Sequence, residues 1–102
     1  MAFGFPPSVT IRIPVTACRS GDLWNATRAA CASLGWAATE SPGRIFVSRS
    51  PSFLSWGEHI EIIWEGPGSI VATSRGAFPL QWIDWGKNAS NLSQLTAAIG
   101  RY

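Results

Sequence analysis

The alternation of apolar and polar residues over Glu58–Glu65 constrains the fold of this chain more than any other feature. Every second residue of its central part, from Ile60 through Trp64, is apolar. This period of two predicts a β-strand with one buried face. The glycine- and proline-rich stretch 66–68 then predicts a turn into a second strand over Ser69–Arg75. A three-residue loop sets Trp64 opposite Ile70, so the pair is expected to form an antiparallel hairpin with one apolar face.

Five further segments show a strand or helix pattern. The predicted strands are Ser8–Pro14, Trp36–Glu40 and Arg44–Ser50, and the predicted helices are 21–34 and Asn88–Ile99. We expect Ser20 to be the N-cap of the first helix, with Asp22 in its first turn, where negative charge suits the helix dipole. Gly35 stands where a helix often ends on a left-handed glycine.

The order of these elements, β-α-β-β-β-β-α, predicts an α+β fold in two layers. The last four strands are joined by short turns and form an antiparallel meander, so we expect a five-stranded, mainly antiparallel sheet with both helices on one face. The element order is the same as in each half of the TATA-binding protein, a similarity of topology that implies nothing about DNA. The 102 residues are expected to form one domain, 1–102, in which 1–7 is an irregular N-terminal arm.

The apolar stripes of these elements predict the core. The residues expected to be nearly fully buried are Ile11, Leu34, Ile45, Val47, Ile60, Ile62, Leu92, Leu95 and Ile99. The two cysteines, Cys18 and Cys31, stand about 15 Å apart along the first helix, which is beyond the span of a disulfide. We therefore expect two free thiols.

The composition favours a protein that binds something. Hydrophobic residues make up 46 % of the chain and charged residues 14 %, and there are six tryptophans. The predicted hairpin also sets Ile63 opposite Val71 on the face that the helices leave uncovered. We therefore expect a non-enzymatic interaction module that binds a protein partner or a second copy of itself there. The alternative is a binder of small apolar ligands, with a pocket between sheet and helices lined by Trp24, Trp36 and Trp64.

A second group of candidate binding residues lies in two tryptophan-containing segments and at the ends of the elements beside them. It consists of Trp56, Glu58, Trp82, Asp84, Trp85, Lys87 and Asn88. Tryptophan faces can bind sugar rings, bases or side chains, while a carboxylate and an amide orient polar groups. The structural interpretation is favoured: Asp84 or Asn88 caps the last helix, and the tryptophans close the open end of the core.

Several function classes receive no support from the sequence. The net charge of +2 comes from basic residues scattered along the chain, which does not favour nucleic-acid binding. His59 is the single histidine and has no ligand spacing to either cysteine, so we expect no metal and no cofactor. No nucleophile motif or phosphate-binding glycine loop is present, which speaks against an enzyme. The N-terminus lacks the features of a secretory signal and no apolar run could span a membrane, so we expect a cytoplasmic protein.

Part of the chain resembles a known group of proteins. Asp84, Gly86 and Asn88 match an Asp-x-Gly-x-Asn turn before a final helix, and Ser74 with Arg75 match a Ser-Arg pair that ends the preceding strand. Residues 55–95 thereby resemble small bacterial domains of unknown function. The resemblance implies a strand hairpin followed by a turn and a helix, and it implies no reaction.

Overall fold

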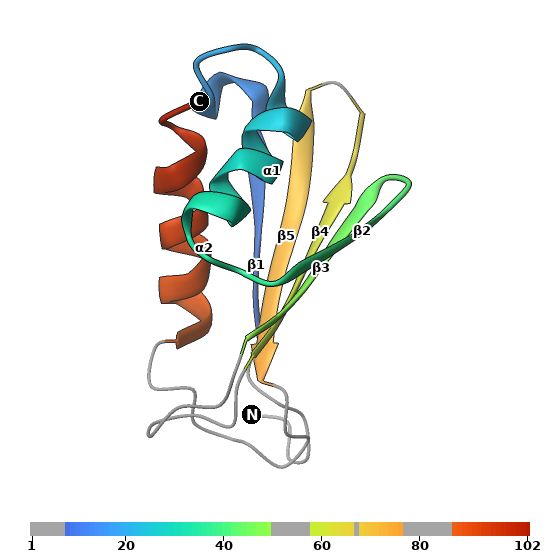
Figure 1. Cartoon of the computed structure of the whole chain (residues 1–102), viewed down its shortest axis with the longest axis vertical. Coiled ribbons are helices and arrows are strands. Elements are labelled where there is room, and N and C mark those ends of the chain that lie inside the picture. Colours follow the sequence, from blue (N-terminus) through green and yellow to red (C-terminus); the bar gives the residue numbers. More distant parts are fainter. Residues whose placement is uncertain (1–7, 50–57, 67, 77–86) are drawn as a thin grey trace.

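The expected order of strands and helices is confirmed in a computed structural model of the chain (Figure 1). The structure describes residues 8–49, 58–66, 68–76 and 87–102, so the predicted arm at 1–7 lies outside them. The strands are β1 (Ser8–Pro14), β2 (Ala38–Ser41), β3 (Arg44–Arg49), β4 (Glu58–Trp64) and β5 (Ser69–Gly76). The helices are α1 (Leu23–Ser33) and α2 (Lys87–Ile99), and a single 3₁₀ turn, Val15–Ala17, follows β1.

The strands form one sheet in the order β1-β5-β4-β3-β2, and every neighbouring pair is antiparallel. Trp64 lies opposite Ile70 and Ile63 opposite Val71, which is the register that the turn length predicts. Both helices pack on the same face of the sheet (Figure 1). The two-layer α+β fold is therefore confirmed. We call the covered side the inner face and the opposite side the outer face.

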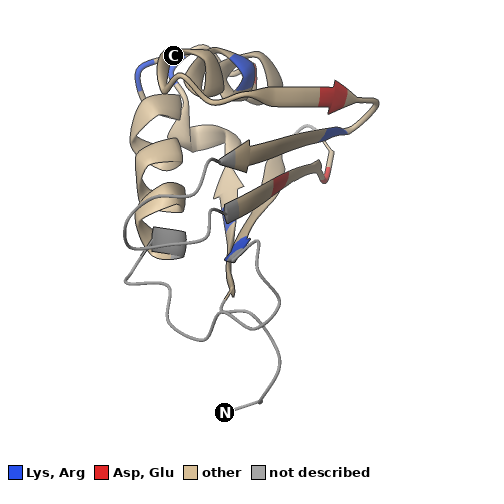
Figure 2. Ribbon diagram, turned by 60° about the horizontal axis from the view of Figure 1, so that its bottom comes forward, with Lys and Arg blue, Asp and Glu red and all other residues tan. Residues whose placement is uncertain are grey.

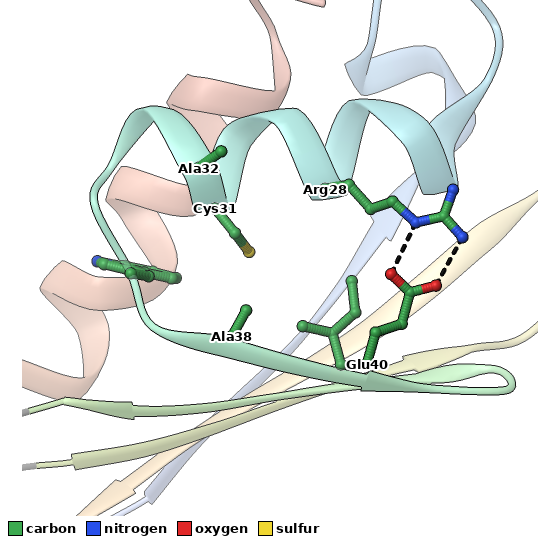
Figure 3. Close-up of a pocket in the computed structure, with 7 residues that line it drawn as sticks. Arg28, Cys31, Ala32, Ala38 and Glu40 are labelled. Atoms are coloured by element: carbon green, nitrogen blue, oxygen red, sulfur yellow. Dashed lines mark hydrogen bonds and ion pairs between the residues drawn. The ribbon is translucent and has the colours of Figure 1, made fainter.

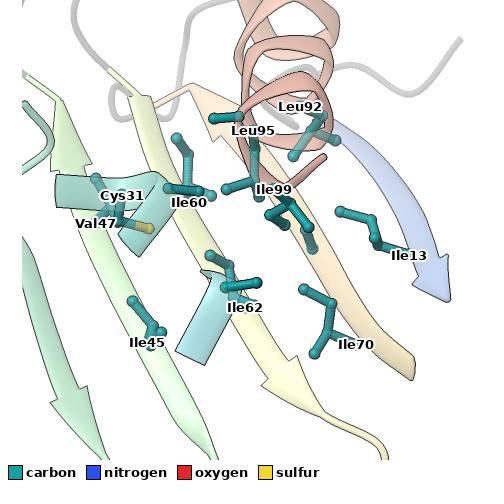
Figure 4. Packing of buried hydrophobic residues seen from close by; sticks show 14 of the residues in the cluster. Ile13, Cys31, Ile45, Val47, Ile60, Ile62, Ile70, Leu92, Leu95 and Ile99 are labelled. Atoms are coloured by element: carbon teal, nitrogen blue, oxygen red, sulfur yellow. The ribbon is translucent and has the colours of Figure 1, made fainter. Parts of the chain in front are cut away.

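The core lies between the inner face and the two helices (Figure 4). Seven of the nine residues expected there are buried: Ile45, Val47, Ile60, Ile62, Leu92, Leu95 and Ile99. The expectation is wrong for Ile11 and Leu34, which are half-buried. Ile11 belongs to β1, an edge strand with a neighbour on one side alone, and Leu34 is the C-cap of α1.

Helix α1 begins later than predicted. Its N-cap is Asp22, whose carboxylate accepts a hydrogen bond from the backbone N–H of Asn25, 3.2 Å away. Ser20 is therefore not the cap; its hydroxyl accepts from the N–H of Asp22 and its own N–H donates to the carbonyl of Tyr102. A cap must reach the third N–H of the helix, and of the two polar residues Asp22 stands at that distance in sequence.

The strand predicted at Trp36 also begins later, at Ala38. The backbone N–H of Trp36 donates to the carbonyl of Cys31, so this residue still belongs to the C-terminal turn of α1. Such a bond satisfies a carbonyl that the helix end leaves without an intrahelical partner. Pro42 and Gly43 then form the two-residue turn that joins β2 to β3.

One polar pair is buried where α2 meets the sheet. The Asn91 amide donates to the hydroxyl of Ser74 on β5 across 3.2 Å, and both residues are buried. Because a buried polar group needs its partner in one place, this bond fixes the position of α2 along β5.

Candidate functional site

The predicted interface residues lie together on the outer face. Ile63 on β4 is directly opposite Val71 on β5; Ile63 is 37 % exposed and Val71 is half-buried. The structure adds Phe46, which is 39 % exposed on β3 and lies diagonally beside Ile63. The outer face of a half-buried sheet is normally polar, so three large apolar side chains on adjacent strands form an unusual patch. We call Phe46, Ile63 and Val71 the outer apolar patch.

Paired charges border this patch. The Arg12 guanidinium binds the Glu65 carboxylate through two hydrogen bonds of 2.7 and 3.1 Å. Its hydrogen bond lowers the pKa of Glu65 below the ordinary value. Arg44 lies 3.3 Å from the carboxylate of Glu61. Since these pairs satisfy each other within one chain, the outer face carries little uncompensated charge at this end.

A shallow hollow of about 200 Å³ lies beside the patch. It is lined by Phe46, His59, Glu61, Thr73 and Arg75. The His59 ring packs against Phe46 with ring centroids 5.3 Å apart and a tilt of 52°. The single histidine thus makes an aromatic contact on the outer face. Among the described residues no group of three His, Cys, Asp or Glu side chains could hold a metal ion.

A larger hollow lies on the other side of the sheet, between α1 and the edge strand β2 (Figure 3). We call it the α1–β2 pocket; its volume is about 310 Å³. It is lined by Arg28, Cys31, Ala32, Trp36, Ala38, Glu40 and Ile45. In Figure 3, Cys31 and Ala32 on α1 face Ala38 on β2 across the pocket. The walls are apolar apart from one end, where Arg28 and Glu40 lie.

A network of hydrogen bonds fixes that polar end. The Arg28 guanidinium donates to both carboxylate oxygens of Glu40, at 2.8 and 2.6 Å, and to the side chain of Asn25. The carboxylate also accepts from the indole of Trp24 at 3.3 Å. The hydrogen bond from Arg28 lowers the pKa of Glu40, and the one from Trp24 adds to that effect. A bidentate pair of this kind holds α1 and β2 in a defined geometry.

Cys31 lines the pocket as a protonated thiol. Burial raises the pKa of Cys31 to about 11, because a thiolate is poorly stabilised away from water. Near neutral pH the group is therefore an apolar wall and a poor nucleophile. Cys31 and Cys18 are both free, as expected.

The three tryptophans of the alternative hypothesis do not share one pocket. Trp24 and Trp64 pack edge to face, with ring centroids 5.7 Å apart, and line a separate hollow of about 240 Å³ with Gly43. Trp36 lines the α1–β2 pocket. Trp64 stands at the end of the inner face and is 37 % exposed, because the β2–β3 hairpin extends away from α1 there (Figure 1).

Most of the predicted tryptophan-segment site lies outside the described residues. This holds for Trp56, Trp82, Asp84 and Trp85. The remaining three are described by their backbone alone: Glu58 begins β4, and Lys87 and Asn88 begin α2. Since α2 starts at Lys87, Asn88 is the second residue of the helix and not the residue before it.

Sequence reasoning missed Phe46 and the Arg28–Glu40 pair. The alternation that buries Ile45 and Val47 places Phe46 on the opposite face, so the signal for it was present. No such signal exists for Arg28 and Glu40, which are 12 residues apart on a helix and a strand. Their meeting depends on how α1 lies across the sheet.

The chain defines a class by its fold, a two-layer α+β domain with an open antiparallel sheet. No family model, no curated protein and no solved structure matches it. The resemblance to bacterial domains of unknown function therefore stays a prediction. In the described part of the chain, no helix is both long and apolar enough to cross a membrane.

The charged residues that the structure describes are dispersed over both layers (Figure 2). Blue and red segments alternate on the sheet, where Arg12 pairs with Glu65 and Arg44 with Glu61. Proteins that bind nucleic acid usually concentrate basic side chains on one face. This distribution does not add support for a nucleic-acid partner.

Proposed function

We propose that this protein is a non-enzymatic interaction module that self-associates through the outer face of its sheet. The observation that carries the proposal is the outer apolar patch, Phe46, Ile63 and Val71. These side chains come from three adjacent strands of a sheet whose helices all lie on the other side. Removing such a patch from water is the main favourable term in protein association.

A second copy fits this face in area. Five strands about 4.8 Å apart, with lengths up to about seven residues at about 3.3 Å each, cover roughly 500 Å². Two such faces bury roughly 1,000 Å² together, the lower limit for a specific interface. Because association also costs rotational and translational freedom, the dimer is expected to be weak and to form at micromolar concentrations or above.

A second copy also fits this face in charge. A two-fold axis that stacks the sheets with their strands antiparallel places the Arg75 end of each copy over the Glu65 end of the other. Arg12 already occupies Glu65, so the added attraction from Arg75 orients the copies more than it stabilises them.

Sedimentation of the wild-type protein and of Ile63→Asp tests the proposal. We expect the wild type to dimerise and Ile63→Asp to weaken the dimer by at least about tenfold, because the new carboxylate would be buried without a partner. The matched control is Ser93→Asp, which adds the same charge at an exposed position of α2 and should leave the dimer unchanged. A wild type that stays monomeric up to millimolar concentration would sink the proposal.

A further inference from the structure

The α1–β2 pocket exists because small side chains stand on both of its walls. Ala32 on α1 and Ala38 on β2 carry a single methyl group each, and Cys31 between them is short. Protein interiors are otherwise packed without voids of this size, since a larger side chain would fill them. A pocket of about 310 Å³ beside a packed core is room that the fold leaves unused.

The walls and the polar end of this pocket define the chemistry of a ligand. The buried side chains of Trp36, Ile45 and Cys31 give water no strong hydrogen-bonding partners, so water in contact with them is readily displaced by an apolar group. The Arg28–Glu40 pair at one end is fixed before any ligand arrives. Two guanidinium N–H groups of Arg28 remain after the bonds to Glu40 and Asn25, and they can donate to one acceptor.

We propose that the α1–β2 pocket binds a compact aromatic molecule with one neutral hydrogen-bond acceptor. The ring lies against Trp36 between Ala32 and Ala38, and the acceptor points to Arg28. An apolar cavity of about 150 Å³ already holds benzene, so the α1–β2 pocket has room for one substituted ring. A carboxylate is disfavoured as the polar group, because Glu40 lies beside the guanidinium.

This binding is noncovalent and independent of self-association. The protonated thiol of Cys31 offers no nucleophile to the ligand. The pocket opens on the helical side of the sheet, whereas the proposed dimer uses the outer face. A failure of either proposal therefore leaves the other intact.

Titration with p-cresol and with toluene, followed in amide and indole ¹H–¹⁵N spectra, tests the site. We expect saturable shifts for p-cresol at Ala32, Ala38 and the Trp36 indole. Toluene has the same ring and lacks the hydroxyl, so it should bind at least about threefold more weakly. Equal binding of the two probes would overturn the role of Arg28.

Variants that fill the pocket separate this site from general hydrophobic contact. Ala38→Leu should weaken p-cresol binding at least tenfold, and Ala32→Leu should do so from the opposite wall. Ala97→Leu makes the same change at an exposed position of α2 and should have no effect. Well-dispersed spectra show whether each variant is folded. The proposal is overturned if no shift saturates, if the shifts centre on Trp24 and Trp64, or if a folded filling variant binds like the wild type.

Discussion

At the scale of single residues, position in the backbone decides the role of several small side chains. Gly35 ends α1 with a φ of +72°, a conformation in which other residues are strained. Its N–H donates to the carbonyl of Ala32, and the N–H of Trp36 donates to that of Cys31. These two bonds form a Schellman motif, which turns the chain from α1 toward β2 and brings Trp36 into the pocket wall.

Gly35→Ala is therefore expected to destabilise the protein by about 1 kcal/mol, through strain in the left-handed conformation. No atom lies within 4 Å of the added methyl group, so steric contact adds nothing. The control is Gly68→Ala, which also meets nothing within 4 Å and has no positive φ. Urea unfolding should show a change below about 0.5 kcal/mol for that control. Equal effects of the two substitutions would contradict the assigned role of Gly35.

At the scale of elements, ion pairs tie segments that share no backbone ladder. Arg28 and Glu40 join α1 to β2, and Arg12 and Glu65 join β1 to the end of the β4–β5 hairpin. In each pair, hydrogen bonds from the arginine lower the pKa of the carboxylate. Both pairs are solvent-exposed, so they set geometry more than they stabilise the fold.

The Arg28–Glu40 pair makes stability depend on pH in a defined direction. Because the pKa of Glu40 is lowered in the folded state, the unfolded chain takes up the proton first as the pH falls. The contribution is full above the unfolded pKa, about 4.3, and is lost as the pH drops toward the folded one. Glu40→Gln should thus be less stable than the wild type at pH 7, and the difference should shrink below about pH 4.3.

Thermal unfolding from pH 7 to pH 3, at low and high salt, measures this effect. The control is the same substitution in an Arg28→Met background, where the carboxylate has lost its main partner and no comparable pH dependence is expected. A difference between Glu40→Gln and wild type that stays constant over the whole pH range would contradict the role of the pair.

At the scale of the whole molecule, the two faces of the sheet assign opposite roles to neighbouring residues. Ile62 on the inner face is 0 % exposed, while Ile63 on the outer face is 37 % exposed. One face is buried under the helices and the other meets solvent, so identical side chains one residue apart differ in what they contribute.

Ile62→Ala is expected to cost about 2–5 kcal/mol of unfolding free energy, because it leaves a cavity in the core. Ile63→Ala should cost less than about 1 kcal/mol in a dilute sample, where the protein is monomeric. Guanidinium unfolding of the two variants compares them directly. Similar losses would show that the outer face is covered within one chain, which would also remove the basis of the proposed dimer.

Much of this architecture was predictable because it depends on short-range rules. The period of two along β4 and β5 and the length of the turn between them set which residues face each other, so the Ile63–Val71 pair was found before the structure. Among the described candidate residues, this pair alone was placed correctly as a spatial cluster. Phe46 followed from the same rule.

The sequence by itself determined the order of the elements, the register of the β4–β5 hairpin and the end of α1 at Gly35. Each follows from local periodicity, turn length or backbone freedom. The tertiary structure alone decided that Glu40 meets Arg28 and that small residues on α1 and β2 leave a pocket between them. These contacts join residues on separate elements, and their positions depend on how α1 packs across the sheet, which no local pattern encodes.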